Sequence, residues 1–398
     1  MTETKIRMLL VDDEASILSA LRRLLRHEDW HLRLASSGEA GLAALDEEAA
    51  DIVISDVRMP EMDGLTFLRC VRERHPAAVR VVLTGYAEEE ELLVAFRDGD
   101  THEIITKPWD DAMLRERLRT MVAQVTVQRH ERRDLSELIR RFDPLPALPA
   151  AYAQLQTALA VAEPAIDAVA AALLREPSLA AKVLQIANSS LFGQYRRVET
   201  VSRAVVVIGL RSVQALAAAG AAFLAFPDGG DLDRELLWEH GLRVGDLARR
   251  LAAGAGADAA GQEEAAVAGL LHDVGKLAFD AHAGADYAGI QRLAAAEHLS
   301  VQEAERRQFG CSHALLGGHL VDWWQLPPVY GDILRAHHTP MSSRLAPMLT
   351  AAVHVADAVD RRALGDTDAC IDAWALRLLD LDAAALEDLG DTPPPPAT

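Results

Sequence analysis

Short apolar runs alternate with amphipathic stretches along roughly the first 122 residues of the chain. The stretch Ala15–His27, for example, places its leucines and Ile17 on one face of a helix. The apolar runs, which we predict to be strands, are Ile6–Val11, Leu32–Ala35, Ile52–Ser55, Val79–Leu83 and Glu103–Thr106. Strands that alternate with helices predict an α/β domain, a doubly wound five-stranded parallel sheet covered on both faces.

The pattern changes after this domain. Residues from about 110 to 142 have the periodicity of one long amphipathic helix, which the proline-containing segment 143–149 should end. From Ala150 to about Leu389 apolar residues recur at helical spacing, which predicts an all-α domain. We therefore expect a first domain at 1–122, a connecting helix at 123–143, a helical domain at 144–390 and a disordered tail at 391–398.

The composition limits the binding partners and the cellular compartment that we expect for this protein. The formal net charge of −20 disfavours binding to nucleic-acid phosphates or anionic membranes, so we expect neither. No stretch approaches the roughly 20 uninterrupted apolar residues of a membrane helix. Cys70, Cys311 and Cys370 are scattered, odd in number and not at metal-binding spacing, which fits a reducing compartment. These features together predict a cytoplasmic protein.

Polar residues stand at the carboxyl ends of the predicted strands. They are Asp12 and Asp13 after the first strand, Asp56 after the third, Thr84 after the fourth and Lys107 after the fifth. These strand ends meet at one edge of a parallel sheet. Clustered carboxylates repel one another and require a cation, and oxygen ligands suit Mg²⁺. A carboxylate beside Mg²⁺ and a lysine can attack a phosphoryl group.

The same segment resembles the receiver (CheY-like) domain of two-component response regulators over about 120 residues, through the motifs VDDE, SDVRMPEMDG, LTG and KPW. The resemblance implies a flavodoxin-like fold and a histidine kinase as phosphoryl donor. It implies the following roles: Asp56 as phosphoacceptor, Asp12, Asp13, Asp56 and the backbone carbonyl of Arg58 as Mg²⁺ ligands, and Thr84 and Lys107 as contacts of the phosphoryl oxygens. Ile104 departs from the pattern, because receivers often have an aromatic switch residue there.

A second group of polar residues lies in the helical half. The candidate metal ligands are His240, His272, Asp273, His313, His337, His338 and Asp357. Mixed nitrogen and oxygen ligands suit Mn, Fe, Ni or Zn, and two such ions could activate water for phosphoester hydrolysis. Lys276, one helical turn after His272, is a candidate phosphate contact. The alternative is a set of structural histidines, in which His354 simply pairs with Asp357 on one helix face.

Residues from about 144 to 362 resemble the HDOD family, which is related to the HD phosphohydrolases. The resemblance rests on LPALPAAYAQL, REPSLAAKVLQIANSSLFGQ, VSRAVVVIGLRSVQAL, GLLHDVGK, WQLP, HH and VHVAD. It implies a regulatory or signalling module, although this chain keeps a nearly full set of ligands. The ligand order is similar to that of HD-GYP phosphodiesterases, but Thr339-Pro340-Met341 stands where Gly-Tyr-Pro would follow. We expect Asn188, within IANSS, to make local hydrogen bonds.

Three hypotheses follow from these features. The one we favour is a response regulator in which phosphorylated Asp56 changes how the HDOD domain binds downstream signalling proteins. The second is a phosphorylation-controlled, metal-dependent phosphohydrolase that acts on a nucleotide or cyclic dinucleotide. The third, a scaffold whose receiver is never phosphorylated, is disfavoured by the complete acidic pocket. The connecting helix makes a homodimer plausible.

Overall fold

A computed structural model of the protein describes residues 5–85, 90–97, 99–142, 145–161, 163–192, 197–226, 230–366 and 369–382. The tail expected to be disordered, 391–398, lies outside these residues, as do parts of the expected breaks at 143–149 and 227–231. The chain divides into two compact units, residues 1–130 with 344–347 and residues 131–343 with 348–398.

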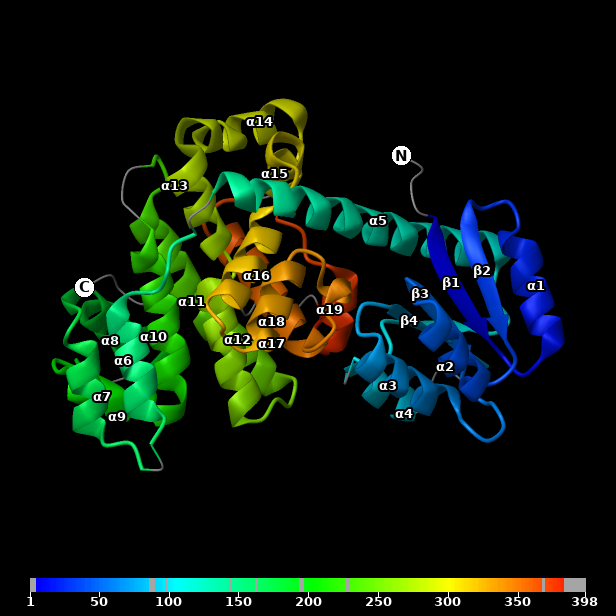
Figure 1. The fold of residues 1–398 in the computed structure, drawn as a ribbon, viewed down its shortest axis with the longest axis horizontal. Helices are drawn as coiled ribbons and strands as arrows, with labels where there is room; N and C mark the ends of the chain where they lie inside the picture. Colours follow the sequence, from blue (N-terminus) through cyan, green and yellow to red (C-terminus); the bar gives the residue numbers. More distant parts are fainter. Residues whose placement is uncertain are drawn as a thin grey trace. The chain divides into compact units, whose positions relative to one another are not determined.

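Unit 1 contains the predicted parallel sheet (Figure 1). Its strands are β1 (Ile6–Val11), β2 (Trp30–Ala35), β3 (Ile52–Asp56), β4 (Val79–Thr84) and β5 (Glu103–Thr106). They are ordered β2-β1-β3-β4-β5, and every neighbouring pair is parallel. The prediction of an α/β domain with five parallel strands is confirmed, and β1 and β5 have the predicted bounds.

Helices cover both faces of this sheet because its central strands are apolar on both sides. One core joins the sheet to α1 (Ala15–Leu25) and α5 (Asp111–Arg141) through residues such as Leu21 and Leu118. The opposite core joins it to α2 (Gly38–Glu47), α3 (Gly64–Arg74) and α4 (Glu90–Arg97). Helix α5 is the long helix predicted from about 110 to 142, and from Glu131 onwards it belongs to unit 2.

Unit 2 is helical throughout its described residues, as predicted (Figure 1). Beyond the end of α5 it consists of α6 (Ala150–Leu159), α7 (Ile166–Leu173), α8 (Pro177–Asn188), η1 (Ser190–Phe192), α9 (Val201–Ile208), α10 (Leu210–Ala225), α11 (Arg234–Gly254), α12 (Ala259–Leu271), α13 (Val274–Ala288), α14 (Ile290–Glu297), α15 (Val301–Phe309), α16 (His313–Trp323), α17 (Pro328–Ala336), η2 (Pro340–Ser342), α18 (Pro347–Ala363) and α19 (Ala373–Leu378). Among the described residues no single helix is long and apolar enough to cross a membrane, and α9 with α10 satisfies the criteria only as a pair bent by 120°.

Glycines let two helix pairs in unit 2 approach closely. In the pair α11 and α12, a Cβ added to Gly245 would lie 2.6 Å from the Ala266 carbonyl oxygen, and one added to Gly269 would lie 2.7 Å from the Gly245 Cα. In the pair α13 and α16, a Cβ on Gly275 would lie 2.1 Å from the His313 carbonyl oxygen. Candidate metal ligands lie in or beside these helices: His240 is in α11, His313 is in α16, and His272 and Asp273 stand between α12 and α13.

Candidate functional sites

The strand ends of unit 1 bring the predicted receiver residues together. Ligand oxygens of Asp12, Asp13 and Asp56 lie within 4.8 Å of one another. The Lys107 Nζ atom donates to Asp56 Oδ1 at 2.6 Å and to Asp12 Oδ2 at 2.9 Å. Thr84, at the end of β4, is buried. The cluster has the donor set that Mg²⁺ prefers, with an ammonium group already against the predicted phosphoacceptor.

Burial and the hydrogen bonds of Lys107 shift the pKa values in this pocket in opposite directions. Burial raises the pKa of Asp12 and outweighs the opposing hydrogen bond from Lys107. Burial lowers the pKa of Lys107, but the hydrogen bonds to Asp12 and Asp56 outweigh it and leave that pKa raised. The lysine therefore keeps its charge beside Asp56. Ile104, at the position where receivers often have an aromatic residue, is partly buried and packs against the core beneath α2, α3 and α4.

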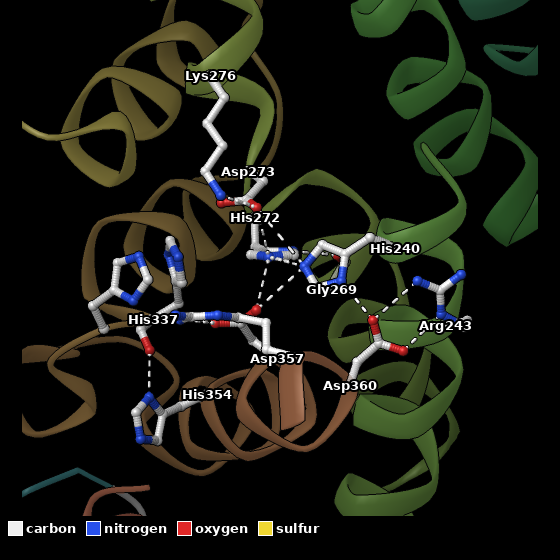
Figure 2. A network of polar contacts seen from close by, with 12 residues as sticks. His240, Arg243, Gly269, His272, Asp273, Lys276, His337, His354, Asp357 and Asp360 are labelled. Atoms are coloured by element: carbon white, nitrogen blue, oxygen red, sulfur yellow. Dashed lines mark hydrogen bonds and ion pairs between the residues drawn. The ribbon is translucent and has the colours of Figure 1, made fainter. Parts of the chain in front are cut away.

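In unit 2 one group of ligand atoms forms where α11, α12, α13 and α18 meet (Figure 2). The His240 Nε2 atom lies 3.2 Å from His272 Nε2 and 3.2 Å from Asp357 Oδ1. The Asp273 Oδ2 atom lies 3.4 Å from His272 Nε2 and 3.8 Å from His240 Nε2. Two nitrogens and two carboxylate oxygens thus face a common centre, which suits a transition-metal ion.

A second group shares Asp273 with the first. The other carboxylate oxygen, Asp273 Oδ1, lies 3.1 Å from His313 Nε2. The His313 Nε2 atom is in turn 2.9 Å from His338 Nε2, and ligand atoms of His313, His337 and His338 all lie within 4.8 Å of one another. The His337 Nε2 atom is buried and has no hydrogen-bond partner among the described residues. A carboxylate between two such groups suits a pair of metal ions.

Four of these histidines are held through their other ring nitrogen. The Nδ1 atoms of His272 and His337 lie 2.7 Å from the carbonyl oxygens of Gly269 and Leu334, three residues earlier in the chain. Carboxylates contact the other two: Asp360 Oδ2 lies 2.7 Å from His240 Nδ1, and Glu305 Oε2 lies 2.6 Å from His313 Nδ1. Metal-bound histidines are oriented in this way in proteins. The donor set and its orientation therefore fit a metal centre.

The electrostatics of the site follow from crowded, buried opposite charges. Burial opposes the charged form of His272, yet Asp273 and Asp357 outweigh it and raise the pKa of this histidine to about 10. Burial, together with His272 and His313, holds the pKa of His337 well below its ordinary value. Burial and His337 do the same for His338. A lowered pKa favours the neutral imidazole, the form that binds a metal ion.

Other expectations can be compared with the geometry. His354 does not pair with Asp357, which was the alternative that its spacing allowed. The His354 Nδ1 atom instead lies 2.7 Å from the His337 carbonyl oxygen, and its Nε2 accepts from the Asp372 backbone at 2.9 Å, while Asp357 faces His240 and His272. Asn188 makes the expected local hydrogen bonds, to the carbonyl oxygens of residues 184 and 198.

Lys276 is placed close to the ligands, because its Nζ atom donates to Asp273 Oδ2 at 2.6 Å. It lines a cavity of about 860 Å³ that also reaches His240, Asp273, His313, His338, Asp357 and Arg361. Five of the seven candidate ligands thus line a cavity that can admit a small molecule. Sequence reasoning missed Asp360 and Glu305, the two carboxylates that orient His240 and His313.

Two family models match the chain, one in each of the two compact units. The family model of the response regulator receiver domain matches residues 8–119, and that of the HDOD domain matches residues 145–340. The hydrogenase transcriptional regulatory protein HoxA of Cupriavidus necator is 35% identical over 109 residues, which are 27% of this chain and 22% of that regulator. The chain spans less than a third of the length of such curated relatives.

Two solved structures are similar to the larger part of the chain. An HDOD domain protein of unknown function from Geobacter sulfurreducens is 29% identical, with a TM-score of 0.50, and the match covers 60% of this chain and 79% of that one. A candidate phosphohydrolase from Shewanella amazonensis is 26% identical, with a TM-score of 0.51, and the match covers 63% of this chain and 92% of that one.

Proposed function

This chain joins a response regulator receiver domain to an HDOD domain, and we propose that phosphorylation of Asp56 controls a metal-dependent phosphohydrolase in the HDOD domain. The observation that carries the proposal is the convergence of His240, His272, Asp273 and Asp357, with a second histidine group on the other side of Asp273. This arrangement raises the phosphohydrolase above the signalling module favoured by sequence alone.

In the receiver, Asp56 is the proposed phosphoacceptor and a histidine kinase the proposed donor. Asp12, Asp13, Asp56 and the Arg58 carbonyl would hold Mg²⁺. Lys107 already donates to Asp56 and would neutralise charge on the incoming phosphoryl oxygens, together with the Thr84 hydroxyl. The support for these roles is the close grouping of the three carboxylates with the lysine.

In the HDOD domain, Mn, Fe, Ni or Zn would occupy the two ligand groups. Two such ions would supply an activated water and neutralise charge that develops on a phosphoester. The chain itself holds the imidazoles in place through Asp360, Glu305 and backbone carbonyls. Lys276 and Arg361 line the cavity and would contact substrate oxygens. The volume of about 860 Å³ is large enough for a nucleotide or cyclic dinucleotide.

The second candidate is a signalling module that binds partner proteins without catalysis. It is favoured by Thr339-Pro340-Met341, which follows His338 in place of Gly-Tyr-Pro. The name of the Shewanella amazonensis neighbour, a candidate phosphohydrolase, supports the enzyme instead.

The full chain, loaded with Mn²⁺ or Zn²⁺, should be tested on bis(p-nitrophenyl) phosphate and on nucleotides and cyclic dinucleotides, with and without acetyl phosphate. We expect hydrolysis that depends on the metal, changes on phosphorylation and is lost in the His272→Ala/Asp273→Ala variant. If a chain with bound metal hydrolyses none of these compounds, the catalytic proposal is overturned in favour of the signalling module.

A further inference from the structure

The end of helix α5 packs directly on the helix that carries Glu305. The buried Glu131, in α5, accepts a hydrogen bond of 2.7 Å from Arg306 Nε, in α15. Gly310, just after α15, comes so close to α5 that an added Cβ would lie 2.8 Å from the Asp134 Cβ. Because α5 begins in the receiver unit, this contact joins the connecting helix to α15.

Glu305 is the residue next to Arg306, and it is fully buried beside the second ligand group. One of its carboxylate oxygens, Oε2, lies 2.6 Å from His313 Nδ1 and also accepts from the His313 backbone N–H at 2.8 Å. The carboxylate therefore fixes both the ring and the backbone of His313. Its other oxygen, Oε1, accepts from the Tyr287 hydroxyl at 3.0 Å.

A set of aromatic rings joins the same carboxylate to Phe142, the residue directly after α5. The Phe142 ring meets the Phe279 ring edge to face, with centroids 6.1 Å apart. Phe279 stacks on Tyr287 at 5.2 Å, and the Tyr287 hydroxyl then reaches Glu305. All three rings are buried, so a displacement of Phe142 has to be taken up by its neighbours.

We propose that Glu305 is a positioning residue for the second metal-ligand group, and that the end of α5 sets its position through Arg306 and Tyr287. The proposal rests on the metal centre proposed above and names how the receiver regulates it. A movement of α5 that follows phosphorylation of Asp56 changes the orientation of His313, and with it the affinity for one of two metal ions.

The first experiment measures Zn²⁺ affinity of the full chain by competition with a chelator, in excess Mg²⁺ to fill the receiver. Glu305→Gln should weaken one of two Zn²⁺ equivalents by about 10–100-fold and leave the other unchanged. Tyr287→Phe removes only a hydroxyl and should weaken the same equivalent by a smaller factor. His338→Ala should remove that equivalent, and adding Glu305→Gln to it should bring no further loss.

The second experiment repeats this titration with acetyl phosphate. Phosphorylation should shift the affinity of the same equivalent in the wild-type chain, and Arg306→Ala should abolish the shift. Arg307→Ala is the matched control, because the neighbouring Arg307 pairs with Glu297 instead of α5 and should retain the shift.

The outcomes separate the two proposals. A wild-type chain that binds no Zn²⁺ in this domain overturns the metal centre itself. The positioning role alone is overturned if Glu305→Gln and Tyr287→Phe leave the affinity of both Zn²⁺ equivalents unchanged. It is also overturned if they weaken both equivalents by the same factor. A phosphorylation shift that survives Arg306→Ala, or is absent from the wild type, overturns the regulatory role of α5.

Discussion

Replacing Gly275 by alanine should separate the two halves of the metal centre without replacing a ligand. Gly275 follows Asp273 by two residues and lies against the start of α16, where His313 stands. An added Cβ would lie 2.1 Å from the His313 carbonyl oxygen and 2.8 Å from the Gly317 nitrogen, both of which are backbone atoms. To restore even a 3.0 Å contact, α16 would have to move by about 0.9 Å from α13.

This displacement is several times the tolerance of about 0.2 Å on metal–ligand distances. We therefore expect Gly275→Ala to weaken the metal equivalent at His313, and overpacking to lower the free energy of unfolding by about 1–3 kcal/mol. Zn²⁺ stoichiometry and urea unfolding followed by circular dichroism measure the two effects. The control is Gly254→Ala, at the end of α11, where an added Cβ meets nothing within 4 Å. If Gly275→Ala matched this control in both assays, the close approach of α13 and α16 would not shape the site.

Three further changes test other parts of the molecule. Asp56→Ala should abolish labelling by acetyl phosphate, whereas Asp46→Ala, at an exposed position, should not. Asn188→Ala removes hydrogen bonds that tie α8 to the following loop, and should lower the free energy of unfolding by about 1–3 kcal/mol in urea titrations. Ser300→Ala breaks the capping box with Glu303 at the start of α15 and should cost about 1 kcal/mol. The hydrogen bonds from Ser300 lower the pKa of Glu303. The stability that they contribute is therefore present above the ordinary glutamate pKa and is lost as pH falls through the lowered pKa. The difference in unfolding free energy between Ser300→Ala and the wild type should shrink over the same pH range.

The receiver domain could be predicted almost completely from sequence. The central strands β1, β3 and β4 are buried along nearly their whole length, so they appear as apolar runs, and β1 and β5 have the predicted bounds. Parallel topology then places the residues that follow each strand at one edge, which is why Asp12, Asp56 and Lys107 could be grouped before the structure was known.

The HDOD site could be predicted only in part. The ligand types were recognised, but helical periodicity does not say which helices meet, and the close approach of α13 to α16 requires the absence of a Cβ at Gly275. Glu305 gave no signal, because a glutamate in the amphipathic segment around it is typical of a solvated face, yet it is fully buried. His354 stands three residues before Asp357, so spacing allowed a pair between them, but the His354 ring contacts the His337 carbonyl oxygen instead.

The central claim, a two-metal centre in the HDOD domain, is tested most directly by metal analysis of the full chain purified without chelators. We predict two equivalents of Mn, Fe, Ni or Zn, lost in the His272→Ala/Asp273→Ala variant and retained in His319→Ala, which changes a histidine of α16 outside both ligand groups. A folded chain with no transition metal, or metal that persists when His272 and Asp273 are replaced, would contradict the account.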